Sequence, residues 1–142
     1  TMGIICAEVI AGLPARKLDY RMIPRATYTQ PQVASFGYTE KQAQEAGYNV
    51  RTGKFPFMAN GKALGYGETA GYIKLVINEH NNQLLGASLV GPEVSELLPE
   101  LTLAQANGLT VEAIAQNIHA HPTLSEVLME AAEAAEGHAD HL

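Results

Sequence analysis

The feature that most constrains the fold is a pair of β-forming runs at residues 71–78 and 83–90. The first reads Gly-Tyr-Ile-Lys-Leu-Val-Ile-Asn, the second reads Gln-Leu-Leu-Gly-Ala-Ser-Leu-Val, and the turn-forming sequence Glu-His-Asn-Asn stands between them. Two such runs joined by so short a turn predict an antiparallel hairpin. Residues 26–29, 33–36 and 48–57 favour further strands. The chain is therefore expected to contain an antiparallel sheet built around this hairpin.

Between the first predicted strands and the hairpin, the pattern of caps and glycines predicts a short helix. Thr39 followed by Gln42 has the spacing of a capping box, so a helix should begin there and stop at Gly47. The glycine-rich residues 60–67 predict a flexible connection instead.

After the hairpin, apolar residues recur with the period of a helix. One stripe predicts a long helix that ends at Asn107-Gly108, and Pro99 is expected either to kink it or to mark its first turn. Thr110 begins a short helix, and a last helix ends at Gly137. The stripes consist of Val94, Leu97, Leu98, Leu101 and Ala104, and of Leu124, Val127, Leu128, Ala131, Ala132 and Ala135; Glu130, Glu133 and Glu136 are expected to lie away from the second.

This order of elements predicts an α+β fold in which helices cover one face of an antiparallel sheet. The 142 residues suit one domain, and 46% of them are apolar, which is enough for a core. A net charge of -6 argues against nucleic acid as a partner, because phosphate binding needs clustered Lys and Arg. No apolar run is long enough to cross a bilayer, so no membrane association is expected.

The two ends of the chain lead to further expectations. Residues 3–11 read as a helix already in progress, without an N-terminal signature, which indicates a cut end rather than a natural start. Residues 137–142 are expected to be an unstructured tail. The single cysteine, Cys6, cannot form an internal disulfide and suits a reducing, cytoplasmic compartment.

The chemistry of the chain is concentrated in residues 119–126, His-Ala-His-Pro-Thr-Leu-Ser-Glu. Histidine moves protons near neutral pH, and a neighbouring carboxylate stabilises the imidazolium and fixes the tautomer. His121 and Glu126 can meet if Pro122 turns the chain and Glu126 lies in the first turn of the last helix. The His121-Pro122 bond is a candidate cis peptide. These residues form a candidate acid–base pair.

Two other interpretations of the same segment stay open. Thr123 and Glu126 have the spacing of a capping box, with Thr123 at the N-cap, and the residues alone favour this role. Both roles can coexist, because a carboxylate has two oxygens. A metal site would need His119 and His121 with His138, Asp140 or His141, but their spacing does not match a helical zinc motif, and no metal is expected.

Four segments resemble one family, the dimerisation (interface) domain of the pyridine nucleotide–disulfide oxidoreductases, and within it the dihydrolipoamide dehydrogenase branch most closely. The most specific of them is 119–126, where Leu124-Ser125-Glu126 fits that branch better than glutathione or mercuric reductases. The others are residues 23–40, residues 59–63 with 67–75, and residues 84–98.

The resemblance implies an isolated piece of a larger flavoenzyme. Residues 1–12 would be a remnant of the last helix of an FAD domain, and residues 13–136 would be the dimerisation domain. FAD and NAD would belong to the full-length enzyme, and none is expected in this chain. The alternatives are a stand-alone homodimeric interaction module without catalysis, or the same domain from a glutathione or mercuric reductase relative.

For the site, the resemblance implies that His121 and Glu126 are the catalytic base and its partner, supplied to the active site of the other subunit. His121 and Pro122 would lie against the flavin of that subunit, and His119 would be a supporting residue. The full-length enzyme would oxidise dihydrolipoamide with NAD and would meet the lipoyl domains of 2-oxo acid dehydrogenase complexes. The isolated chain would be inactive.

Overall fold

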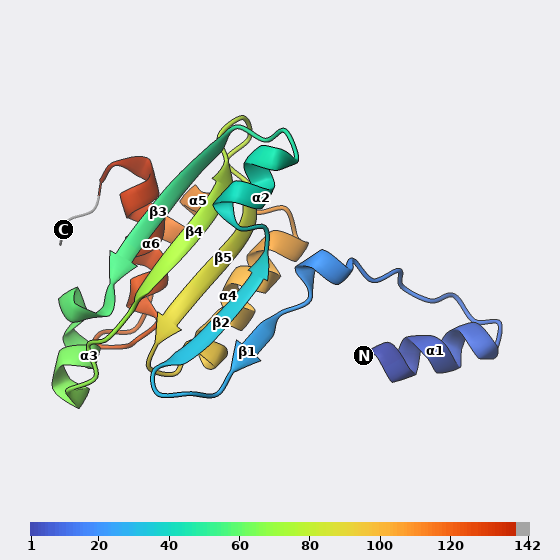
Figure 1. Ribbon diagram of the computed structural model, residues 1–142, viewed down its shortest axis with the longest axis horizontal. Helices are drawn as coiled ribbons and strands as arrows, with labels where there is room; N and C mark the ends of the chain where they lie inside the picture. The colour runs from blue at the N-terminus through green and yellow to red at the C-terminus, as the bar shows by residue number, and fades with distance from the viewer. Residues whose placement is uncertain (139–142) are drawn as a thin grey trace.

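The computed structural model describes residues 1–138 and is built on a five-stranded antiparallel sheet in the order β1-β2-β5-β4-β3 (Figure 1). The expected hairpin is the pair β4–β5 at the centre, paired from Tyr72 opposite Val90 to Ile77 opposite Leu84. The strands are β1 (Arg25–Thr27), β2 (Gln32–Gly37), β3 (Val50–Pro56), β4 (Tyr72–Asn78) and β5 (Leu84–Gly91).

Three helices, α4, α5 and α6, lie behind the sheet in Figure 1, and α1 lies apart at the end of an extended segment. The predicted fold class is therefore confirmed. One helix, α2, packs on the opposite face, where its Ala43 meets Val76 and Leu85. The helices are α1 (Met2–Ile10), α2 (Glu40–Glu45), α3 (Gly61–Tyr66), α4 (Val94–Ala106), α5 (Val111–Ala115) and α6 (Glu126–Glu136), with 3-10 turns at Tyr20–Met22 and Phe57–Ala59.

The core lies between the sheet and the helices, where the predicted apolar stripes face inward. All five stripe residues of α4 are buried, and so are those of α6 itself, from Val127 to Ala135. The prediction that Glu130 lies away from this face is wrong, since Glu130 is buried. The reason is helical spacing: position 130 follows Val127 by three residues, which places the two side chains on the same side of the helix.

The prediction of a flexible connection at residues 60–67 is also wrong. Asn60 is the N-cap of α3, where its side-chain oxygen accepts a hydrogen bond from the Ala63 amide, and Gly67 closes the helix in the left-handed conformation. The asparagine and glycines that suggested a loop are thus the two caps of a short helix. Pro99 lies in the second turn of α4, and the helix continues through it to Ala106.

Helix α6, which carries Glu126 at its first position, is seated directly on β3. At Gly53 the two backbones approach so closely that a Cβ atom would lie 2.0 Å from the carbonyl oxygen of Ala131. At the other end of α6, Glu136 forms an ion pair with Arg51 of β3. The sheet therefore determines where α6 begins and where the Glu126 side chain can reach.

Candidate active site

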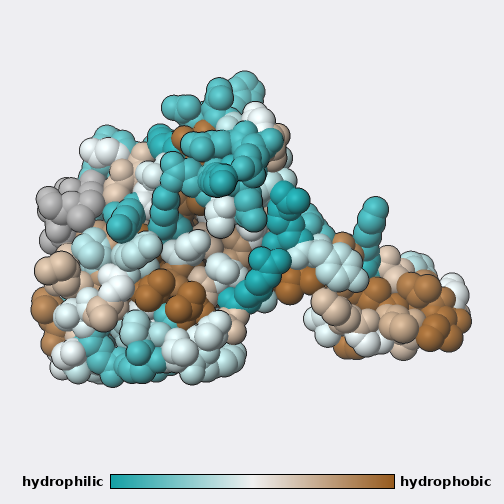
Figure 2. Space-filling model, in the orientation of Figure 1, coloured by the Kyte–Doolittle hydropathy of each residue, from teal (hydrophilic) through white to brown (hydrophobic). Residues whose placement is uncertain are grey.

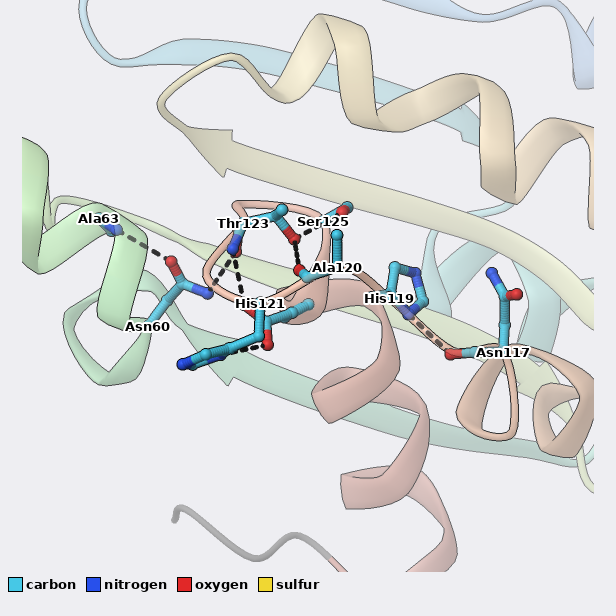
Figure 3. A network of polar contacts seen from close by, with 9 residues as sticks. Asn60, Ala63, Asn117, His119, Ala120, His121, Thr123 and Ser125 are labelled. Atoms are coloured by element: carbon cyan, nitrogen blue, oxygen red, sulfur yellow. Dashed lines mark hydrogen bonds and ion pairs between the residues drawn. The ribbon is translucent and has the colours of Figure 1, made fainter.

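His121 lies in the loop that precedes α6 (Figure 3), in contact with Glu126, the first residue of that helix. The His121 Nδ1 atom is 2.8 Å from the Glu126 Oε1 atom, and the bond between His121 and Pro122 is cis, as proposed from the sequence. A carboxylate only accepts hydrogen bonds, so Nδ1 carries the proton and donates it. The lone pair of the neutral ring is then on Nε2, at the far end of a side chain that is 80% exposed. The arrangement presents an oriented proton acceptor to the outside.

Glu126 is held from a second direction. Its other oxygen, Oε2, accepts a hydrogen bond of 2.7 Å from the backbone N–H of Thr123. Burial by itself raises the pKa of the Glu126 carboxyl, but the hydrogen bonds from Thr123 and His121 and the positive charge of the histidines outweigh it. The pKa of Glu126 therefore lies below its ordinary value, and the group is a carboxylate at neutral pH.

The expected capping box at Thr123 forms only in half. The Glu126 carboxylate does accept from the Thr123 N–H, but α6 begins at Glu126 and its N-cap is Ser125. The Thr123 hydroxyl donates instead to the Ala120 carbonyl at 2.7 Å. The prediction that Thr123 is the N-cap is therefore wrong by two positions. The Thr123 hydroxyl bonds within the loop that contains His121 and does not accept a hydrogen bond from the first turn of α6.

His119 has a different environment from His121. Its side chain is only 5% exposed, and its two ring nitrogens face the Asn117 carbonyl at 2.8 Å and the Glu100 carboxylate at 3.0 Å. Both partners are acceptors, so a ring nitrogen that carries a proton donates it to one of them. His119 thus anchors the loop to helix α4 through Glu100.

Asn60, which the sequence did not single out, also contacts this loop. Its side chain is buried, caps α3, and donates a 3.1 Å hydrogen bond to the carbonyl of Thr123. Glu100 was missed in the same way. Both residues reach the loop across a long stretch of chain, and neither belongs to a local pattern that could have indicated the contact.

Residues 1–138 contain no group of three or more His, Cys, Asp or Glu side chains arranged to hold a metal ion. Asp140 and His141 lie outside the described residues. Likewise, no helix of the described part is long and apolar enough to cross a membrane.

His121 lies outside a sizeable cavity in the described part of the chain. That cavity, of about 830 Å³, lies between residues 16–24 and α4, and its walls include Arg16, Met22 and Leu103. The candidate base is instead on an exposed loop. Such a base can serve a buried substrate only if a further surface covers it, because an open site leaves the reacting groups in water.

Comparison with known proteins identifies relatives over nearly the whole chain. The family profile described as "Pyridine nucleotide-disulphide oxidoreductase, dimerisation domain" matches residues 23–132. The chain is 53% identical over 137 residues to the dihydrolipoyl dehydrogenase of Mycobacterium tuberculosis, covering 96% of the chain and 30% of that protein. It is 48% identical over 140 residues to the dihydrolipoyl dehydrogenase of Bacillus subtilis, covering 99% of the chain and 30% of the relative.

Solved structures give the same result for the fold. The crystal structure of LpdA from Mycobacterium tuberculosis superimposes with a TM-score of 0.84 at 25% identity, covering 92% of this chain and 28% of that one. The chain therefore spans about 30% of the length of the curated relatives that it matches.

Proposed function

Because the chain belongs to the pyridine nucleotide-disulphide oxidoreductase dimerisation domain family, we propose that it pairs two subunits of a dihydrolipoyl dehydrogenase, also called dihydrolipoamide dehydrogenase, and supplies the base of the partner's active site. The observation that carries the proposal is the His121–Glu126 pair. One histidine nitrogen is tied to a carboxylate, and the other faces outward from an exposed loop. A base displayed in this way suits an active site that closes only between two subunits.

In the proposed reaction, His121 acts on a thiol of dihydrolipoamide. The Nε2 atom takes the thiol proton, and the resulting imidazolium is stabilised by the Glu126 carboxylate. The thiolate so formed is the nucleophile: its attack on the redox disulfide of the other subunit would form a mixed disulfide and release the second sulfur of that disulfide as a thiolate. Glu126 also keeps the Nδ1 proton in place, so that the lone pair stays on Nε2 throughout.

The cofactors of the full-length enzyme would be FAD and NAD, which carry the electrons away from the disulfide. His121 and Pro122 are both exposed, so this segment can lie against a flavin that another subunit holds. Neither residue is used to hold the core together. On this proposal the 142-residue chain forms half of a site, binds no flavin and has no dihydrolipoamide oxidation activity alone. A flavin absorbance spectrum from the purified chain would contradict that statement.

The partners follow from the same proposal. The chain should form a homodimer, and the full-length enzyme should meet lipoyl domains of 2-oxo acid dehydrogenase complexes, which carry dihydrolipoamide. We propose a cytoplasmic setting, since the one cysteine, Cys6, is free and suits a reducing compartment.

The test is the substitution His121→Gln in the full-length protein. Loss of a general base should lower the rate of dihydrolipoamide oxidation by ~10²–10⁴-fold. Glu126→Gln should cost less, because the base remains. His80→Gln is the matched control, since His80 is also an exposed histidine but lies in the turn between β4 and β5. Near-normal turnover of His121→Gln would refute the assignment.

Substrate assays separate the alternatives. Glutathione disulfide and mercuric ion, offered to the full-length protein, should be poor substrates beside dihydrolipoamide; the reverse ranking would place the domain with those other reductases. A stand-alone module is tested by the reading frame upstream of Thr1. The absence there of both a Gly-x-Gly-x-x-Gly motif and a closely spaced cysteine pair would support the module without catalysis.

A further inference from the structure

We propose that Asn60 is a positioning residue for the base: by fixing the backbone of Thr123 it holds Glu126, and through Glu126 it holds His121. Its relevance to catalysis rests on the proposed function, but the positioning itself is a property of this chain. The residue acts through others and touches no substrate, and it lies 63 positions from the loop that it would control.

The first support is the burial and full hydrogen bonding of the Asn60 side chain. The residue is 5% exposed. Its Oδ1 accepts from the Ala63 N–H at 2.9 Å, and its Nδ2 donates to the Thr123 carbonyl at 3.1 Å. One partner can only donate and the other can only accept, so the amide has a single satisfied orientation.

The second support is the residue of the loop to which Asn60 donates its hydrogen bond. Thr123 is held at both backbone groups: its carbonyl accepts from Asn60, and its N–H donates to Glu126 Oε2. Asn60, Thr123 and His121 lie along one run of contacts in Figure 3, and the link from Thr123 to His121 passes through Glu126. Because the Thr123 carbonyl is fixed by Asn60, the backbone of Thr123 is less free to rotate, and its N–H stays directed at the Glu126 carboxylate.

The third support is that Asn60 is flanked by residues of the hydrophobic core. It follows the 3-10 turn Phe57–Ala59, whose Phe57 is fully buried, and it begins α3, whose Ala63 is fully buried. The anchor therefore belongs to the core rather than to the loop. A hydrogen bond from the core to an otherwise exposed loop is how a scaffold holds a functional side chain in a defined geometry.

The alternative role for Asn60 is that of a helix cap alone. Two substitutions separate the roles. Asn60→Ser retains an oxygen that can cap α3 but cannot reach the Thr123 carbonyl. Asn60→Asp retains the acceptor for Ala63 but has no N–H to donate. The matched control is Thr39→Ala, which removes the cap of α2 on the opposite face of the sheet.

The decisive measurements use the 142-residue chain. We expect both Asn60 variants to raise the pKa of Glu126 toward its ordinary value in a ¹³C NMR titration of the carboxyl carbon, because the Thr123 hydrogen bond that lowers this pKa is loosened. Exchange of the Thr123 amide hydrogen should become at least about tenfold faster. Thr39→Ala should lower the melting temperature without changing either quantity.

Two results would overturn the proposal. One is an unchanged Glu126 titration and an unchanged Thr123 exchange rate in folded Asn60→Ser and Asn60→Asp, which would leave Asn60 as a cap only. The other is an equal change in Thr39→Ala, which would show a general loosening of the domain.

A second assay uses the full-length protein. The Asn60 variants should lower the turnover of dihydrolipoamide by about 10- to 100-fold, as expected when a catalytic group is misplaced. Transfer of electrons from NADH to ferricyanide, which requires no thiol deprotonation, should be unchanged. If the unaltered full-length protein does not oxidise dihydrolipoamide, the proposed function fails, while the NMR result still decides whether Asn60 positions the pair.

Discussion

The contact between α6 and β3 at Gly53 gives the sharpest test of how the site is supported. In Gly53→Ala, the new methyl group would lie 2.0 Å from the carbonyl oxygen of Ala131 and 2.7 Å from the Cβ of Ala135. The first atom belongs to the backbone and the second is a Cβ, so neither can rotate away. Relief requires the whole helix to move off the strand, which separates the side chains that α6 buries.

The expected cost follows from these contacts. Overpacking of a core costs about 1–3 kcal/mol, and here it lies at the upper end because the obstruction is backbone. The smaller conformational freedom of alanine in the unfolded chain offsets only about 0.4–1 kcal/mol. A net loss of about 2–2.6 kcal/mol corresponds to a fall in melting temperature of about 7–9 °C, taking an unfolding entropy of about 2.1 cal/mol/K per residue.

Gly65→Ala is the matched control for this prediction. Gly65 lies within α3, and a Cβ there would meet nothing within 4 Å. The same chemical change should raise stability by about 0.5–1 kcal/mol, because alanine is the better helix former. The assay is thermal unfolding of both variants followed by circular dichroism. A melting temperature of Gly53→Ala equal to or above that of the unaltered chain would refute the packing argument.

The remaining predictions concern charged groups. The pKa of Glu126 is lowered in the folded chain, so the ionised group stabilises the fold above the ordinary carboxyl pKa, and this stabilisation is lost as the pH falls through the folded pKa. The free energy of unfolding, measured with urea at pH 7 and pH 3, should therefore fall less on acidification in Glu126→Gln than in the unaltered chain. His119→Ala removes both hydrogen bonds of the ring and leaves Glu100 only the one from the Asn117 side chain. It should lower the unfolding free energy by about 1–3 kcal/mol, and an unchanged value would contradict the anchoring role. Arg51→Met removes the ion pair with Glu136 and should cost about 1 kcal/mol or less, with a smaller difference in 1 M salt.

Much of the fold was predictable because its signals are local in sequence. The hairpin of residues 72–91 follows from β-forming residues around a turn, and the buried stripe of α4 follows from apolar spacing. The capping box of α2, with Thr39 and Gln42, formed in full. Each of these depends on residues within one or two turns of one another, where backbone geometry alone fixes which side chains share a face.

Prediction from local sequence failed where the same residue types favour two different local structures. Asn60 and the glycines after it are turn formers and equally the caps of a helix, and only the packing of Ala63 against the core selected the helix. The Thr123 hydroxyl could cap α6 or bond within the preceding loop, and in the structure it donates to the Ala120 carbonyl of that loop. Such choices depend on partners that propensity does not include.

The sequence by itself determined the sheet-forming runs and the helical faces, and it offered the pairing of His121 with Glu126, five residues apart, beside a capping role for Glu126. Only the tertiary structure decided what holds that pair. Asn60 reaches Thr123 across 63 positions and Glu100 reaches His119 across 19. The physical reason is that a hydrogen bond depends on the distance between its atoms in space, and sequence patterns report only distance along the chain.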